Sequence, residues 1–310
     1  MERRGMERKL RITIIIPAYN EAEMIGNTVA ALVDLKPEYK EKGLDLRIFV
    51  VDDGSADDTR QLAENAGADR VLRHRVNQGL GAAVRTGLTA AHNDGADITV
   101  KFDADLQHDP NDILPLIQPI RDDEADVVYG NRFERIEYAM PLVRKVGNRV
   151  FTGLMRWLTK WPLKDSQPGI FAVHRVFTGM FYMPGDYNYT QQILVDAYRK
   201  GMRFAHVPVA FRKRVTGKSF ISFKYPFKVL PQIFMVLVAV RPLKVFAPIG
   251  FAFLLPGALI GIWEFFDWAW GSGAKPIQHV NLVLGLTLFG MQTIFFGILA
   301  HLIVDKGGRR

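Results

Sequence analysis

KFDADLQHDP, residues 101–110, holds three aspartates, a glutamine and a histidine within ten residues. It overlaps a largely apolar run at 96–102, which predicts a buried β-strand. If that strand continues, its alternating side chains place Asp103 and Asp105 on one side, with Gln107 two residues further on. Carboxylate and amide oxygens are ligands for hard divalent cations, so the segment predicts a Mg²⁺ or Mn²⁺ site. The alternative is a solvated acidic turn that binds nothing.

Short apolar segments alternate with helical patterns as far as residue 211. The predicted strands are 10–16, 46–51, 70–74, 96–102, 126–129, 170–173 and 204–211. The predicted helices are 21–34, with Asn20 as its N-cap, 56–65, 82–92, 111–120, 134–164 and 189–201. Such alternation predicts an α/β fold with a mostly parallel sheet.

Polar segments follow three of these strands. They are IPAYNE (16–21), VDDGS (51–55) and DADLQ (103–107). Ligands of such sheets bind beyond the carboxyl ends of the strands, so we expect the three segments to form one crevice. GLG at 79–81 could belong to a dinucleotide-binding loop instead. That alternative is disfavoured because the third glycine is missing and the segment does not follow the first strand.

The charge distribution favours phosphate or membrane binding over nucleic-acid binding. The chain has 310 residues, with 40 Lys and Arg against 32 Asp and Glu, giving a net charge of +8. Residues 212–244 contain no acid, and their basic residues are Arg212, Lys213, Arg214, Lys218, Lys224, Lys228, Arg241 and Lys244. A basic block beside apolar sequence is typical of a membrane surface or a phosphate-bearing ligand. The lack of cysteine excludes disulfides and thiolate metal sites, and the charged start MERRGMERK predicts no signal peptide.

Two uncharged segments near the C-terminus, 245–263 and 280–300, are long enough to span a bilayer. The residues between them include a cluster of tryptophans typical of a membrane interface. Basic residues precede the first span and follow the second, so the positive-inside rule predicts both ends of this hairpin in the cytoplasm. The alternative is a pair of helices buried in a soluble core.

Four separated motifs resemble the family-two glycosyltransferases of the glycosyltransferase-A fold. They are IPAYNE (16–21), VVDDGSADDT (50–59), DADLQHDP (103–110) and VYGNRF (128–133), and 165–171 is similar to the family's Asp-x-x-x-Gly-Phe segment. The subgroup that the chain resembles most is the polyprenyl-phosphate sugar transferases, of which dolichol-phosphate mannose synthase is the known type. The resemblance covers about residues 10–220.

The resemblance implies an α/β architecture in three parts. A glycosyltransferase-A catalytic domain, Rossmann-like with a mostly parallel sheet, would occupy 1–218. Interfacial amphipathic helices would occupy 219–244. A two-helix transmembrane hairpin with a short cytoplasmic tail would occupy 245–310.

The implied activity is that of an inverting, membrane-bound, metal-dependent hexosyltransferase. It would move a sugar from a nucleotide-sugar donor, of the GDP-mannose or UDP-glucose type, to a dolichyl or undecaprenyl phosphate. The protein would be a multi-pass protein of the cell membrane whose catalytic domain faces the cytoplasm. Its partners would be the donor, the lipid acceptor and the membrane, without nucleic acid. A homo-oligomer is compatible with the sequence.

The resemblance also implies roles for individual residues. The nucleotide pocket would involve Pro17, Tyr19, Glu21, Val51 and Asp53. The metal and diphosphate would be held by Asp103, Ala104, Asp105 and Gln107, with Mg²⁺ or Mn²⁺ on Asp103, Asp105 and Gln107. The catalytic residues would be Asp105, Arg132 and Arg214. Phosphate groups would meet Arg132, Arg214 and Lys218, with Arg144 as a further acceptor contact. Each arginine could instead be a surface charge.

The chain departs from the family pattern in two places. His206 stands where the family usually carries Glu, and we expect it to tolerate replacement by Glu if it only fills that position. The usual Arg-x-x-Gly-x-Ser-Lys segment reads RVTGKSF over 214–220. Because Phe220 replaces the terminal Lys, Lys218 or Lys224 would have to supply that charge.

Two other functions remain as alternatives. A processive polysaccharide synthase of the same fold needs a Gln-x-x-Arg-Trp segment, but residues 191–195 read QQILV. A non-catalytic membrane subunit that only binds nucleotide would not need the two carboxylates of the DAD segment, which are present.

Overall fold

The computed structural model describes residues 9–136, 148–149, 152–153, 155–157, 159–183, 189–212, 234, 238, 241–271 and 273–307. The chain divides into two compact units, Met1–Phe220 and Ile221–Arg310. The predicted residues Arg144, Arg214 and Lys218, and nearly all of the predicted interfacial segment, lie outside the described residues.

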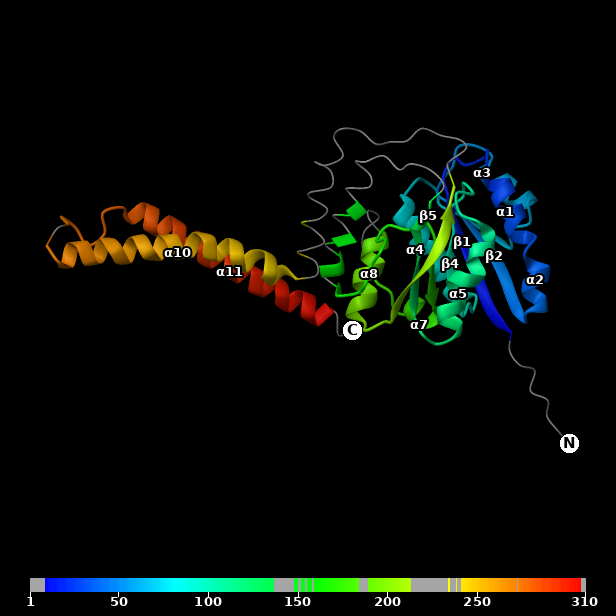
Figure 1. Cartoon of the computed structure of the whole chain (residues 1–310). Helices are drawn as coiled ribbons and strands as arrows, with labels where there is room; N and C mark the ends of the chain where they lie inside the picture. Colours follow the sequence, from blue (N-terminus) through cyan, green and yellow to red (C-terminus); the bar gives the residue numbers. More distant parts are fainter. Residues whose placement is uncertain are drawn as a thin grey trace. The chain divides into compact units, whose positions relative to one another are not determined.

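The first unit is built on a seven-stranded sheet with the strand order β3-β2-β1-β4-β6-β5-β7 (Figure 1). The strands are β1 (Leu10–Ala18), β2 (Leu44–Asp52), β3 (Arg70–Arg73), β4 (Ile98–Lys101), β5 (Val127–Ile136), β6 (Phe171–His174) and β7 (Phe204–Phe211). Only β6 runs antiparallel to its neighbours, β4 and β5. The predicted α/β fold with a mostly parallel sheet is therefore confirmed.

Helices cover both faces of the sheet because the strands at its centre are apolar on both sides. The helices are α1 (Ile25–Val33), α2 (Lys36–Glu41), α3 (Thr59–Asn65), α4 (Leu80–Asn93), η1 (Pro110–Asp112), α5 (Ile113–Arg121), α7 (Arg175–Thr178) and α8 (Tyr189–Arg199). Alternate residues of β1, such as Ile14, share one core cluster with residues of α1 and α5. Ile15 faces the other way, toward α4. A Cβ added at Gly87 would lie 3.0 Å from Ile15 Cβ, so this glycine permits close packing of α4 on β1.

Three local predictions need correction. The strand before the DAD segment ends at Lys101, residues 104–105 form a turn, and Leu106 directly after them has a positive φ of 52°. Asn20 does not cap α1. It has a φ of 52° and its side-chain oxygen accepts a hydrogen bond from the amide of Ala56 at 2.9 Å. The helix predicted from 134 is wrong at its start, because β5 continues to Ile136 beside β7.

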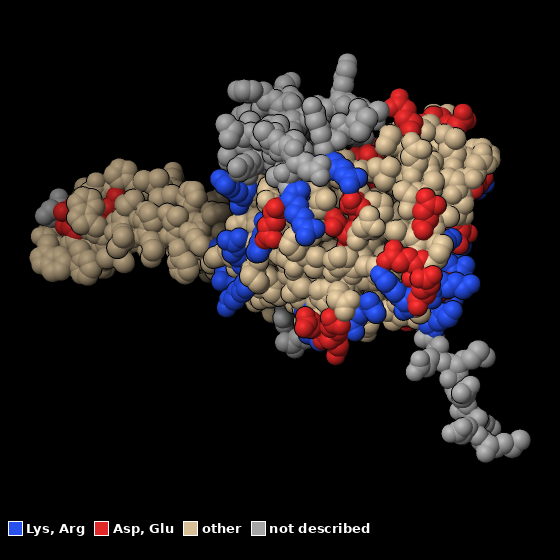
Figure 2. Space-filling view, turned by 45° about the vertical axis from the view of Figure 1, so that its right-hand side comes forward, with Lys and Arg blue, Asp and Glu red and all other residues tan. Residues whose placement is uncertain are grey.

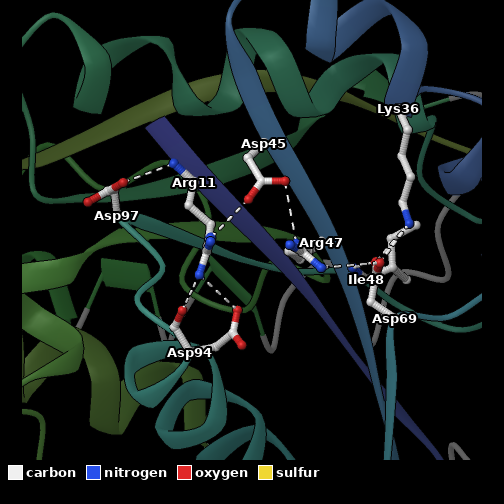
Figure 3. A network of polar contacts seen from close by, with 8 residues as sticks. All are labelled: Arg11, Lys36, Asp45, Arg47, Ile48, Asp69, Asp94 and Asp97. Carbon is white, nitrogen blue, oxygen red and sulfur yellow. Dashed lines mark hydrogen bonds and ion pairs between the residues drawn. The ribbon is translucent and has the colours of Figure 1, made fainter. Parts of the chain in front are cut away.

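Charged side chains close the amino-terminal end of β1 and β2 (Figure 3). Arg11 donates through its backbone amide to Asp97 at 2.9 Å and through Nε to Asp45 at 3.0 Å. Arg47 lies between Asp45 and Asp69, at 3.4 and 3.8 Å. Side chains of opposite charge thus pair with one another at this end of the two strands.

The second unit contains two long helices, α10 (Pro242–Ala269) and α11 (Val280–Gly307), each of 28 residues. They pack against each other as a hairpin and are long and apolar enough to cross a membrane. Only 11% and 17% of their most apolar stretches are buried, which disfavours the alternative of soluble core helices. On the face shown in Figure 2 these helices carry almost no charge, whereas the first unit shows both signs.

Small residues and one buried acid fasten this hairpin. A Cβ added at Gly250 would lie 2.5 Å from Ile294, so the helices approach closely there. Near the loop, buried Glu264 accepts hydrogen bonds from the amide of Gln278 at 2.8 Å and from His279 Nδ1 at 2.6 Å. The acid at the end of the first predicted span therefore has hydrogen-bond partners within the hairpin.

Candidate active site

A cavity of about 350 Å³ lies at the carboxyl ends of β1, β2 and β4. It is lined by Pro17, Ala18, Tyr19, Glu21, Asp53, Asn77, Gly79, Leu80, Ala83, Asp103, Ala104 and Asp105. The three polar segments that follow these strands thus meet as expected. Val51 is fully buried in β2 and is not among the described residues that line the cavity.

Asp53 holds one wall of the cavity in place. Its Oδ1 accepts hydrogen bonds from His74 Nδ1 at 2.7 Å and from the amide of Gln78 at 2.9 Å, and its Oδ2 accepts one from the amide of Gly79 at 2.8 Å. The adjacent Gly54 has a φ of 74°, and a Cβ there would lie 2.6 Å from the backbone of Val76. Asp53 therefore fixes the loop at 76–79 against the wall of the cavity.

The DAD turn is anchored from two sides. The hydroxyl of Thr28, on α1, donates to the carbonyl of Ala104 at 2.6 Å. The Lys101 ammonium, at the end of β4, donates to Asp103 Oδ1 and to the carbonyl of Gly169 at 2.8 Å. Burial alone would lower the pKa of Lys101, but the charges and hydrogen bonds of Asp103 and Tyr189 together outweigh burial and raise this pKa above its usual range. Asp103 and Asp105 therefore line one cavity although they lie in a turn rather than on a strand.

Gln107 joins the DAD segment to the end of β7. Its backbone carbonyl accepts from the amide of Arg212 at 2.8 Å, and its Nε2 donates to the Arg212 carbonyl at 3.1 Å. This arrangement leaves the amide oxygen as the Gln107 atom suited to a cation, although Gln107 is not among the described residues that line the cavity. It also fixes the start of the basic segment that continues to Arg214.

His108 is buried between the DAD turn and the end of β7. Its ring is fully buried, and its Nδ1 donates to the carbonyl of Ala210 at 3.1 Å. Its Nε2 has no hydrogen-bond partner among the described residues and lies 3.9 Å from Asp103 Oδ2. Burial lowers the pKa of His108 to about 4, so the ring is neutral at pH 7. A Cβ at Gly169 would lie 2.4 Å from Nε2, so only glycine fits beside this ring.

Two family matches cover most of the chain. Residues 13–178 match Glycosyl transferase family 2, and residues 241–305 match the GtrB C-terminal hairpin.

The chain belongs to glycosyl transferase family 2.

Named relatives agree with this assignment. This glycosyltransferase is 37% identical over 179 residues to the UDP-N-acetylglucosamine–dolichyl-phosphate N-acetylglucosaminyltransferase of Methanococcus voltae, covering 52% of the chain and 68% of the relative. It is 29% identical over 234 residues to the dolichol-phosphate mannosyltransferase of Pyrococcus furiosus, covering 73% and 63%.

A solved structure shares the fold. The glucosyl-3-phosphoglycerate synthase of Mycobacterium tuberculosis, in a complex with Mn²⁺, UDP-glucose and phosphoglyceric acid, superposes with a TM-score of 0.56 at 21% identity, covering 74% of the chain and 78% of the synthase. The fold of the first unit is thus of the glycosyltransferase-A type, as predicted.

Arg132 of the glycosyltransferase is already paired. Its Nε donates to Asp165 Oδ2 at 2.7 Å and its second guanidinium nitrogen to Oδ1 at 3.2 Å, and both side chains are buried. Burial alone would raise the pKa of Asp165, but the charge and hydrogen bonds of Arg132 outweigh burial and lower this pKa. Arg132 thus joins β5 to the turn at 165–169.

The residues present at the DAD turn fit a divalent cation. Within the described ranges, no three His, Cys, Asp or Glu side chains gather into a closed metal site. Mg²⁺ in sites that act on phosphates is typically held by one or two carboxylates and by substrate oxygens, which matches Asp103 and Asp105 at the wall of a cavity. Sequence reasoning missed Lys101 and His108 here, although a lysine inside an apolar strand was a usable signal.

Proposed function

We propose that this glycosyltransferase moves a sugar from a nucleotide-sugar donor to a polyprenyl phosphate, with inversion. The observation that carries the proposal is the cavity that Asp103 and Asp105 line together with Tyr19, Glu21 and the loop fixed by Asp53. The named relatives that act on dolichyl phosphate, and the match to a C-terminal hairpin, support a lipid acceptor.

The donor nucleotide would occupy the cavity. The Tyr19 side chain is 46% exposed at its wall and offers an aromatic face to a base. Asp103, Asp105 and the amide oxygen of Gln107 would hold Mg²⁺ or Mn²⁺ against the diphosphate. When bound there, the cation supplies positive charge that stabilises the departing nucleoside diphosphate. The sugar could be of the N-acetylglucosamine, glucose or mannose type.

The acceptor needs cations more than it needs a base. A lipid phosphate is already anionic at neutral pH, so the attacking oxygen does not require deprotonation. Arginine binds phosphate through two parallel hydrogen bonds, which suits the basic segment that starts at Arg212. We assign the acceptor phosphate to Arg214, with Lys218 assisting. The buried pair with Asp165 argues that Arg132 acts by holding this region in place rather than by direct contact.

The lipid tail of the acceptor would stay in the membrane while the first unit transfers the sugar to its phosphate head group. The apolar hairpin α10–α11 anchors the protein, and basic residues flank both of its ends. The positive-inside rule then places those ends, and the catalytic unit, on the cytoplasmic side. Nucleotide sugars of the cytoplasm would reach the cavity directly.

A donor screen tests this proposal. Purified full-length protein in lipid nanodiscs is incubated with dolichyl phosphate and, in turn, radiolabelled UDP-N-acetylglucosamine, UDP-glucose or GDP-mannose, with Mg²⁺ or Mn²⁺. We expect one donor to label the lipid, with no labelling in EDTA. Asp105→Ala should remain folded but lose transfer. Near-normal turnover in EDTA or by this variant would contradict the assigned metal site.

A further inference from the structure

Lys101 places a buried positive charge directly against the DAD turn. Its side chain is 1% exposed at the end of β4, in a strand that is otherwise Ile, Thr and Val. The ammonium contacts Asp103 Oδ1 and the Gly169 carbonyl, and it lies 5.8 Å from the centre of the Tyr189 ring. Burial on all sides keeps this charge out of the cavity, so it cannot serve as a ligand for the donor.

The charge of the site follows from these contacts. Asp103 and Asp105 contribute two negative charges, and Lys101 cancels one of them at hydrogen-bond distance. Affinity of oxygen sites for hard divalent cations depends strongly on how much negative ligand charge they present. A nucleoside diphosphate brings the negative charge that the site itself lacks.

We propose that Lys101 is a positioning residue that weakens the binding of a divalent cation to the free enzyme and so makes cation binding depend on the nucleotide diphosphate. This inference rests on the metal site of the proposed function. By linkage, the nucleotide raises the affinity for the cation by the same factor as the cation raises the affinity for the nucleotide. The same contact holds Asp103 in one orientation before the donor arrives.

Manganese binding to the full-length protein tests the role of Lys101. Mn²⁺ is titrated by electron paramagnetic resonance with and without UDP or GDP. We expect wild-type protein to bind Mn²⁺ weakly alone and much more tightly with the preferred nucleotide. Lys101→Met should bind Mn²⁺ alone at least about tenfold more tightly, because a neighbouring positive charge is removed. The gain that the nucleotide provides should shrink in this variant.

Control variants separate the possible causes. Lys36→Met removes a lysine that pairs with Asp69 away from the cavity and should leave Mn²⁺ binding unchanged. Lys101→Gln keeps a hydrogen-bond donor without the charge and replaces Lys101→Met if that variant does not fold. Equal Mn²⁺ affinity in wild type and the uncharged variants would overturn the role of Lys101 alone. Failure of wild-type protein to bind Mn²⁺ under either condition would overturn the proposed metal site itself.

Discussion

Arg132 and Asp165 form a buried, two-point ion pair that joins β5 to a turn 33 residues further along the chain. Asp165 also accepts hydrogen bonds from Asn148 Nδ2 at 3.2 Å and from the amide of Gln167 at 2.9 Å. The pair therefore organises the segment that ends at Gly169, beside Asp103. We infer that the pair holds the surroundings of the DAD turn in place.

Breaking this pair should cost stability. Arg132→Met leaves the Asp165 carboxylate buried without its partner, and we expect a loss of about 3–5 kcal/mol in the free energy of unfolding. The double variant Arg132→Met/Asp165→Leu should lose clearly less than the sum of the single changes. Thermal unfolding in detergent, followed by near-ultraviolet circular dichroism, measures both. Additive losses would show that the two side chains are not coupled.

Stability should fall as the pH drops from about 6.5 to about 4. The His206 ring accepts a hydrogen bond from the amide of Lys164 at 2.9 Å and donates to the Tyr129 carbonyl at 3.2 Å, which requires the neutral form. Burial lowers the pKa of His206 to about 4. Between the two pKa values the unfolded chain binds a proton that the folded chain does not, so acid favours unfolding by up to roughly 3 kcal/mol.

His206→Gln tests this pH dependence. Gln keeps one donor and one acceptor but does not titrate, so the slope of stability against pH should become shallower, with the rest retained by His108 and other groups. An unchanged slope would contradict the assignment. The same geometry argues against the expectation that His206 tolerates Glu, because a carboxylate cannot donate to the Tyr129 carbonyl and would lie beside it.

The apolar runs predicted the strands of the sheet well, because a parallel strand buried on both faces consists of an almost uninterrupted run of apolar residues. The antiparallel direction of β6 could not be predicted, because it depends on pairing with β4 and β5 rather than on its own residues. The two DAD carboxylates line one cavity, as expected. A turn after β4 places them there, whereas the sequence pattern predicted that they would alternate along a strand. The roles of Lys101 and His108 depend on Gly169 and Ala210, which are far away in sequence.

Arg214→Ala should weaken use of the lipid acceptor. Loss of one charged phosphate contact should lower kcat/KM for dolichyl phosphate by roughly 2–4 kcal/mol in transition-state free energy, with little change in donor binding. Arg60→Ala, which removes an exposed arginine on α3 that pairs with Glu64, is the matched control and should behave as wild type. If Arg214→Ala weakened only donor binding, Arg214 would contact the donor rather than the acceptor phosphate.

The loop between α10 and α11 should face away from the catalytic unit's compartment. The chain has no cysteine, so a single cysteine at position 272 gives a clean probe. We expect an impermeant maleimide to label it from outside intact cells. A second variant with a cysteine at the exposed Arg60 should be labelled only after lysis. Labelling of position 272 only after lysis would reverse the predicted topology.

A competition between acceptors tests directly whether the protein transfers sugar to a polyprenyl phosphate. Protein in nanodiscs is offered its preferred labelled nucleotide sugar together with equal concentrations of dolichyl phosphate, 3-phosphoglycerate and a free oligosaccharide, and the products are separated by phase partition and chromatography. We predict that the label enters the lipid fraction as a single sugar that mild acid releases. Preferential labelling of 3-phosphoglycerate, or of a lengthening oligosaccharide, would contradict it.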